Sequence, residues 1–385
     1  MTVNLDIESN SGNSSALKKG VQNLLVNAVR ARMGEKILIV GEKGPATHFD
    51  EHICESVAQV ARDLGFNANI VLSKVGNSAD DFPDSVSKAM QNVDHTIFFS
   101  RLGDQIRFCA TPGKGSKTMC YTPSAEYLAS DFVQTPFQLC QHIHDRLVEK
   151  IAASDRFQLT CPDGTRLTGD LSQFDRPDSE YSASAAVLFT EFTVNPFPLA
   201  IFPPVSAATM SGRLVLQRWL TSSSTISYDN SVFPIVKPVT AMVDKGMITS
   251  LEGDATVCRS IDNHLHEVAH IVGGEATIIN SWHTGMIPST WYKGRAEDDL
   301  ERWSNVTFCS PRFTHLHACG RDPGHVAISL FDASIWFDDD LMWDCGRFVF
   351  PLSPACIEVF DDYKEWLRVY QRNGDICLPN GVIRA

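Results

Sequence analysis

Histidine is concentrated in one stretch of this sequence. Seven of the twelve histidines lie between Asp262 and Ser329. Near neutral pH this side chain is a common metal ligand and proton carrier, so a local excess predicts a site. The seven are His264, His266, His270, His283, His315, His317 and His325.

The segment His266–His270 matches the pattern His-Glu-x-x-His, which on a helix supplies two zinc ligands and a general base. Two glycines follow almost at once, however, and Ala276 stands where an extended zinc-peptidase motif has histidine. With the two-residue period of a strand, the histidines of this segment share one face and Glu267 lies on the other. We therefore expect a strand rather than a zinc-binding helix.

The same period places other candidate side chains together. His325, Ala327 and Ser329 would share one face of a strand, and His315 and His317 would share a face of another. Each histidine taken alone fits a half-exposed sheet, where it needs no ligand. Taken together, several separate segments supply imidazoles, and this favours a metal site.

Outside this stretch the candidates are fewer. Arg101 and Asp104 follow a predicted strand that ends at Ser100, and doubly wound sheets bind ligands outside the carboxyl ends of their strands. Cys319 and Cys345 are expected to be core residues rather than nucleophiles.

These candidates must be positioned by a two-part chain. In residues 1–155, short apolar runs alternate with helical patterns, which predicts a doubly wound, mainly parallel α/β domain. Strands are expected at 36–41, 67–75, 93–100 and 117–122, and helices at 15–33, 48–64, 84–91, 124–131 and 136–153.

Residues 156–385 show a different pattern. Phe157–Cys161 and Thr165–Asp170 flank a Pro-Asp-Gly turn, which predicts a hairpin. Turn residues separate the runs that follow, so this part is expected to be a mainly antiparallel β domain that carries the metal site and ends in a helix at Pro354–Gln371. The further strands are expected at 185–194, 212–220, 234–243, 247–251, 306–310 and 325–331.

Composition limits the partners. Of the 385 residues, 43% are hydrophobic and 21% are charged, as in a globular protein. The net charge of −13 and the absence of a Lys/Arg cluster argue against nucleic acid. No apolar run has membrane-spanning length, so no membrane partner is expected. The polar N-terminus predicts no signal peptide, and the eleven cysteines contain no Cys-x-x-Cys pair, so the cytoplasm is the expected location.

Several segments together resemble one known family. Phe157–Asp170, Gly212–Leu216, Ala269–Ile271 and Gly324–Ile328 are similar to segments of the family that contains the thermophilic aminopeptidases T and S and 2,5-dihydroxypyridine 5,6-dioxygenase. The resemblance spans about residues 18 to 350. It implies an aminopeptidase T-like fold, a homo-oligomer and a divalent metal, which is Fe(II) in the dioxygenase, with Zn or Mn as the alternative.

The resemblance also implies site residues. His270 and His325 match the two iron-binding histidines of the dioxygenase, whereas Ala327 stands where the family has its carboxylate ligand. Three outcomes are then open. A third ligand comes from elsewhere, with His317 expected and His283, His315 and Asp332 as the alternatives; or the metal keeps two histidines and an open position for an external anion; or the metal is lost. Arg101 is the residue nearest to the family's catalytic position, and its guanidinium suits an anionic substrate group.

Three functions follow from this resemblance. The first is a mononuclear non-haem Fe(II) oxygenase-like enzyme that acts on a small aromatic or heterocyclic substrate. The second is an aminopeptidase-like Zn or Mn hydrolase, which needs two ions and therefore more ligands. The third is a non-catalytic protein that binds a short peptide or a small molecule, since two neutral histidines alone hold a divalent ion weakly.

Overall fold

The fold was analysed in a computed structural model. The structure describes residues 5–44, 47–172, 192–223, 225–319 and 324–378. The chain divides into two compact units, one of Met1–Gln141 with Glu191–Leu199 and the other of His142–Thr190 with Ala200–Ala385. The predicted division near residue 155 stays a prediction.

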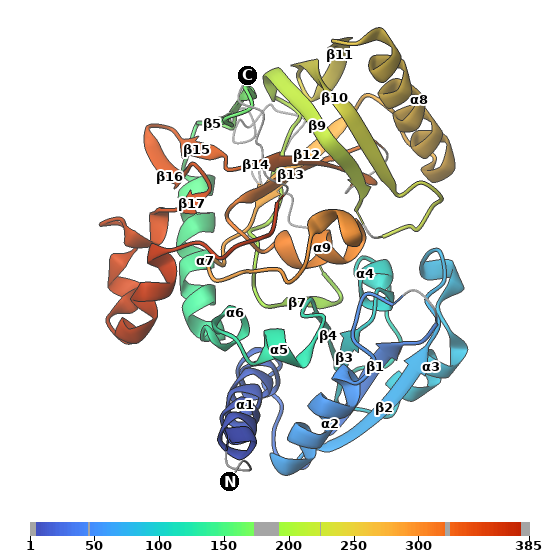
Figure 1. The fold of residues 1–385 in the computed structure, drawn as a ribbon, viewed down its shortest axis with the longest axis vertical. Coiled ribbons are helices and arrows are strands. Elements are labelled where there is room, and N and C mark those ends of the chain that lie inside the picture. Colours follow the sequence, from blue (N-terminus) through green and yellow to red (C-terminus); the bar gives the residue numbers. More distant parts are fainter. Residues whose placement is uncertain (1–4, 45–46, 173–191, 224, 320–323, 379–385) are drawn as a thin grey trace. The chain divides into compact units, whose positions relative to one another are not determined.

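The first unit contains a five-stranded parallel sheet of order β2-β1-β3-β4-β7. One of its inner strands is the predicted apolar run before Gly41, and such runs are typical of strands buried on both faces. The sheet confirms a parallel α/β part of the chain (Figure 1). The strands are β1 (Lys36–Glu42), β2 (Asn67–Ser73), β3 (His95–Phe99), β4 (Ser116–Cys120) and β7 (Asn195–Phe197).

Helices connect and cover these strands. α2 (Ile53–Asp63) and α3 (Asp84–Met90) pack on β1 and β2, and the short α4 (Leu102–Ile106) packs on β3 and β4. The first helix continues into a π-helical turn at Asn23–Ala28. The remaining helices of this unit are α1 (Leu5–Gln22), α5 (Ala125–Leu128) and α6 (Asp131–Gln134), and α7 (Phe137–Ala152) begins in this unit but belongs mostly to the second.

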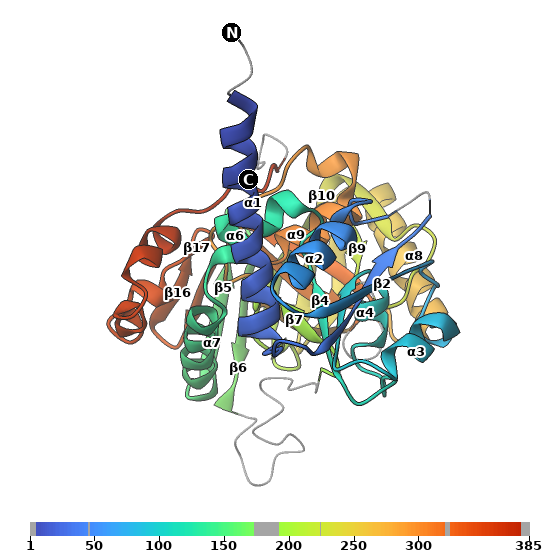
Figure 2. The same ribbon diagram turned by 90° about the horizontal axis from the view of Figure 1, so that it is seen from below.

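The second unit is built on a large, mainly antiparallel sheet. Its strand order is β17-β16-β15-β5-β6-β9-β14-β13-β12-β8, and β10 pairs with β9 and β11. β16 and β17 lie at one side of this unit and α8 at the other in both ribbon views (Figures 1 and 2). The strands are β5 (Arg156–Thr160), β6 (Arg166–Asp170), β8 (Val205–Ser206), β9 (Ser211–Ser222), β10 (Val232–Asp244), β11 (Met247–Glu252), β12 (Ile279–Thr284), β13 (Phe313–Ala318), β14 (Val326–Phe331), β15 (Ser334–Phe337), β16 (Asp340–Asp344) and β17 (Arg347–Phe348).

The predicted hairpin around the Pro-Asp-Gly turn is confirmed. β5 and β6 pair antiparallel with Leu159 opposite Leu167. The Asp163 carboxylate accepts a hydrogen bond of 2.8 Å from the Thr165 N–H, which closes the turn.

The strand predicted around His264–His270 is wrong, because this segment belongs to helix α8 (Ala255–Val272). The helix begins at Asp254, whose carboxylate caps the N–H groups of Thr256 and Val257. It ends at Gly273, which has a left-handed φ of 68°. Its buried side chains recur with the period of a helix: Val257, Ile261, His264, Leu265, Val268 and Ala269.

Two further predictions near the C-terminus are corrected. The strand expected at 306–310 is the end of helix α9 (Leu300–Thr307) and a turn, since Trp303, Val306 and Thr307 are buried at helical spacing. The helix expected at Pro354–Gln371 is instead two 3₁₀ segments, Ile357–Phe360 and Lys364–Gln371. The strand expected at 185–194 lies largely outside the described residues.

The core of the second unit is rich in aromatic side chains. Trp282, Trp303 and Trp343 are completely buried. Trp303 packs edge-on against Phe313 and beside Phe331, so helix α9 covers the face of the sheet to which these two phenylalanines belong. Among the described residues, no helix combines the length and apolarity that crossing a membrane requires.

Candidate metal centre

Two neighbouring strands bring three histidines together. β12 and β13 pair antiparallel, with His283 opposite His315 and Ser281 opposite His317. Residues that lie opposite each other in such a pair point to the same face of the sheet. One nitrogen from each of the three histidines lies within 4.8 Å of the other two, and this arrangement is suited to holding a metal ion.

The three rings form a tight, buried cluster. The Nε2 atoms of His283 and His315 are 2.6 Å apart. Ring centroids are separated by 4.2 Å for His283 and His315, and by 4.9 Å from each of them to His317. The exposed fraction is only 4%, 8% and 5% for His283, His315 and His317. The cluster is therefore shielded from bulk water.

Hydrogen bonds orient two of the rings. The Phe202 carbonyl oxygen lies 3.3 Å from His283 Nδ1, and a carbonyl can only accept, so this nitrogen carries the proton. In the neutral ring, Nε2 is then the acceptor nitrogen, the one that can bind a metal. His317 Nδ1 is hydrogen-bonded to Ser281 Oγ at 3.0 Å, which leaves Nε2 as its other nitrogen. Such partners are the usual outer contacts of metal-binding histidines.

The donor set defines the kind of metal. Three imidazoles suit Zn, Fe, Cu or Ni, whereas Ca²⁺ and Mg²⁺ prefer oxygen ligands. No carboxylate belongs to the group among the described residues. The residues present thus fit one divalent transition-metal ion and leave positions open for further ligands.

The close approach of His283 and His315 also has a simpler explanation. Two neutral imidazoles at 2.6 Å satisfy each other if one nitrogen donates a hydrogen bond and the other accepts it. A buried histidine pair would then be stable without metal. Metal content is the measurement that separates the two explanations.

Of the three predicted ligands, the structure places only His317 in this cluster. His270 is exposed in the last turn of α8. His325 is buried immediately before β14, where its Nδ1 lies 3.2 Å from Thr225 Oγ1. The metal-binding roles of His270 and His325 stay predictions.

The His-Glu-x-x-His segment does lie on a helix, but its side chains face solvent. His266, Glu267 and His270 are all exposed, and His266 Nδ1 is bonded to the Asp262 carbonyl oxygen at 2.8 Å. No group with a third ligand includes them within the described part of the chain. By contrast His264 is buried and stacks on Phe233, and desolvation lowers its pKa.

Arg101 lies in the first unit, directly after β3. Its backbone N–H donates to the Glu42 carboxylate at 2.7 Å, and its Nε lies 3.9 Å from the same oxygen. The neighbouring Asp104 is buried and accepts hydrogen bonds from Tyr121 and Arg107 at 2.6 and 3.1 Å. Burial nevertheless raises the pKa of Asp104. The proposed role of Arg101 toward a substrate anion stays a prediction.

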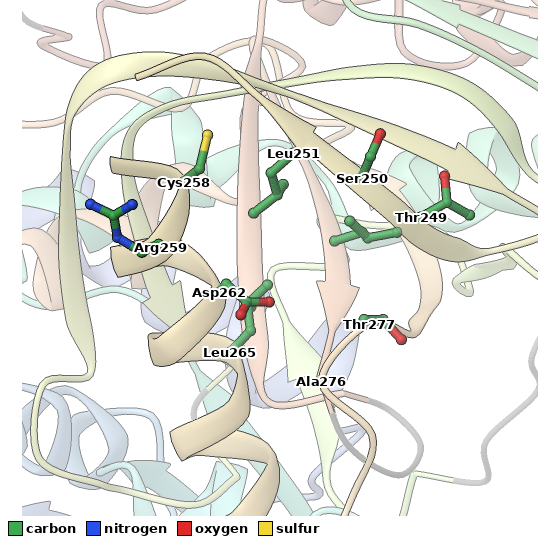
Figure 3. Close-up of a pocket in the computed structure, with 10 residues that line it drawn as sticks. Thr249, Ser250, Leu251, Cys258, Arg259, Asp262, Leu265, Ala276 and Thr277 are labelled. Carbon is green, nitrogen blue, oxygen red and sulfur yellow. The ribbon is translucent and has the colours of Figure 1, made fainter. Parts of the chain in front are cut away.

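A surface groove of about 300 Å³ lies between α8 and β11 (Figure 3). Arg259 and Asp262 line it from the helix, and Thr249, Ser250 and Leu251 line it from the strand. None of the three clustered histidines lines this groove, so it is separate from the candidate metal centre.

All three clustered histidines were candidates from the sequence, but their association in one site could not be predicted from it. The alternation in His315-Leu-His317 indicated a shared face and was a usable signal. The pairing of β12 with β13 was not visible, since the strand that carries His283 was not predicted.

No protein-family model matches the chain, and no curated protein matches it either. The structure of 2,5-dihydroxypyridine dioxygenase from Pseudomonas putida KT2440 aligns with a TM-score of 0.52 and 14% identity over 87% of this chain and 96% of that one. Wild-type AmpT from Thermus thermophilus aligns with a TM-score of 0.47 and 11% identity over 87% of this chain and 99% of that one. The similarity to the dioxygenase shows a common fold.

Proposed function

We propose that this protein is a metal-dependent enzyme that holds a single divalent ion with His283, His315 and His317. The observation that carries the proposal is the convergence of three buried imidazoles from two paired strands. A reaction of the oxygenase type, with Fe(II) and a small aromatic or heterocyclic substrate, agrees with the fold shared with a dioxygenase.

The donor set favours one ion over two. Two-metal hydrolases hold their ions about 3.5–4 Å apart, and that arrangement needs more ligands than three histidines provide. Among the described residues, no Asp or Glu side chain belongs to the cluster. A mononuclear centre therefore fits these residues better than the two-ion centre of an aminopeptidase.

The chain's own residues prepare the site. Phe202 and Ser281 fix the rings of His283 and His317, and this orientation reduces the cost of assembling the ligands. Phe313 stacks on His315 at 5.4 Å and gives the cluster an apolar neighbour that excludes water. When bound, a divalent ion would supply Lewis-acid polarisation of an oxygen ligand.

The test is metal content by mass spectrometry, on protein purified without oxygen and without a histidine tag. We expect about one ion per chain, and we expect His283→Ala, His315→Ala and His317→Ala each to lose most of it. His270→Ala and His325→Ala are the matched controls and should retain the metal. Loss of metal in a control, with retention in the cluster variants, would contradict the proposed ligand set.

Activity assays then separate the reaction classes. Iron with oxygen consumption on hydroxylated heterocycles would support the oxygenase proposal. Zinc or manganese near two per chain, with release of N-terminal residues from simple peptides, would favour a hydrolase. Protein without metal that still binds a small ligand would indicate a non-catalytic binding protein.

A further inference from the structure

The face of the sheet that carries the histidine cluster also carries hydroxyl side chains on the next two strands, β14 and β9. Thr221 of β9 lies opposite Ala327 of β14, which lies opposite His317. His315 in turn lies opposite Ser329. Because directly paired residues point to the same side of a sheet, Thr221 and Ser329 share the face of the cluster.

Both of these hydroxyl groups are buried without a partner. Thr221 and Ser329 are each 2% exposed, and neither hydroxyl oxygen has a hydrogen-bond partner among the described residues. The indole Nε1 of Trp219 is also buried and has no hydrogen-bond partner among the described residues. Trp219 lies two residues before Thr221 in β9, so both side chains are on the same face. Buried polar groups are normally satisfied, so three such atoms on the face of the cluster are available to donate to a bound ligand.

Ala327 separates the hydroxyl of Thr221 from the cluster. Its methyl group offers no hydrogen bond to Thr221 on one side or to His317 on the other. Thr221 and Ser329 are diagonal neighbours on adjacent strands, and such residues lie about 7–8 Å apart. Two O–H···O bonds of about 2.7 Å with a carboxylate between them cover this span.

Charge points to the same kind of ligand. A divalent ion on three neutral imidazoles keeps its full charge of +2 in a buried site, and a buried charge needs compensation. The described residues supply no carboxylate to the group. All the unpartnered atoms can donate hydrogen bonds, as an anionic oxygen requires.

We propose that this face binds the carboxylate group of a small substrate, with Thr221, Ser329 and Trp219 donating hydrogen bonds to its oxygen atoms. The inference rests on the proposed function, because the bound ion supplies the charge that attracts the carboxylate. It assigns Thr221 and Ser329 as substrate-positioning residues.

The experiment is calorimetric titration of the metal-loaded protein with benzoate, and with the neutral benzamide. Benzoate should bind, and Thr221→Val or Ser329→Ala should each raise its Kd by about tenfold or more, as expected for losing a hydrogen bond to a charged group. Benzamide should bind far more weakly to all variants. Metal content should stay unchanged, and thermal stability should not fall, since each change removes an unpaired buried hydroxyl.

The chain offers a matched control in Thr314. Its hydroxyl is also fully buried without a partner among the described residues, but it lies on the opposite face of β13 from His315. Thr314→Val should leave the affinity for benzoate unchanged. The inference would be overturned if Thr221→Val and Ser329→Ala bound benzoate as tightly as the wild type does. It would also be overturned if Thr314→Val lost as much affinity for benzoate as these two variants. Wild-type protein without metal would overturn the proposed function as well, so the two failures are distinguishable.

Discussion

At the scale of single residues, Cys319 and Cys345 differ in burial although both were expected to lie in the core. Cys345 is exposed, which corrects that expectation. Cys319 is fully buried and donates a hydrogen bond of 2.9 Å to the Leu265 carbonyl oxygen. Burial raises the pKa of the Cys319 thiol to about 11.

We predict that iodoacetamide at pH 8 modifies Cys345 at least about tenfold faster than Cys319 in the folded protein, because the thiolate is the nucleophile and Cys319 is both protonated and inaccessible. Peptide mass spectrometry after timed quenching measures the two rates. Urea-unfolded protein is the control, and there the two rates should converge. Equal labelling before unfolding would show that Cys319 is accessible.

Burial of His264 makes the stability of the folded protein depend on pH. Desolvation lowers its pKa below the ordinary value in the folded protein, so the unfolded chain binds a proton more readily as pH falls. The stabilising contribution of this neutral ring is therefore present above the unfolded-state pKa of about 6.5 and is lost as the pH falls below it. We expect His264→Gln to lose less stability than the wild type between pH 8 and pH 5.5, as measured by urea unfolding. An identical loss in both proteins would refute this.

At the scale of elements, helix α8 shows why a period can be misjudged. A window restricted to His264–His270 contains histidines at both two-residue and four-residue spacing, so it fits a strand as well as a helix. The decisive signals lie outside the window. Asp254 caps the helix ten residues earlier, Val257 and Ile261 begin its apolar stripe, and Gly273 ends it.

Gly273 supports a quantitative prediction for this helix. A Cβ placed there would meet no atom within 4 Å, so only the left-handed φ of 68° opposes a larger residue. Gly273→Ala should lower the free energy of unfolding by about 1 kcal/mol, measured in urea, and Gly273→Asn should lower it less. Metal content should not change, because the clustered histidines lie on β12 and β13. An alanine variant as stable as the wild type would contradict the assigned cap.

At the scale of the whole molecule, local sequence signals predicted the parallel sheet and the hairpin but not the histidine cluster. The apolar run before Gly41 and the Pro-Asp-Gly turn at 162–164 are local features, so the parallel sheet and the hairpin could be predicted from them. His283 and His315 are 32 residues apart in the sequence, and only the pairing of β12 with β13 brings them together. The ligand set of such a site depends on strand register, which local periodicity does not determine.

The same long-range assembly makes metal binding a source of stability. An ion that binds the folded cluster but not the unfolded chain stabilises the protein by about 2.7 kcal/mol when it is present at a hundred times its Kd. For a unit of this size, that corresponds to a rise in melting temperature of about 5–10 °C over chelator-treated protein. We expect the rise in the wild type and in His270→Ala, and its absence in His315→Ala, because removal of one of three ligands leaves two neutral imidazoles that bind weakly. Calorimetric melting with and without the metal measures the shift. An equal rise in His315→Ala would place the ion elsewhere in the molecule and would leave the three histidines as a hydrogen-bonded core cluster.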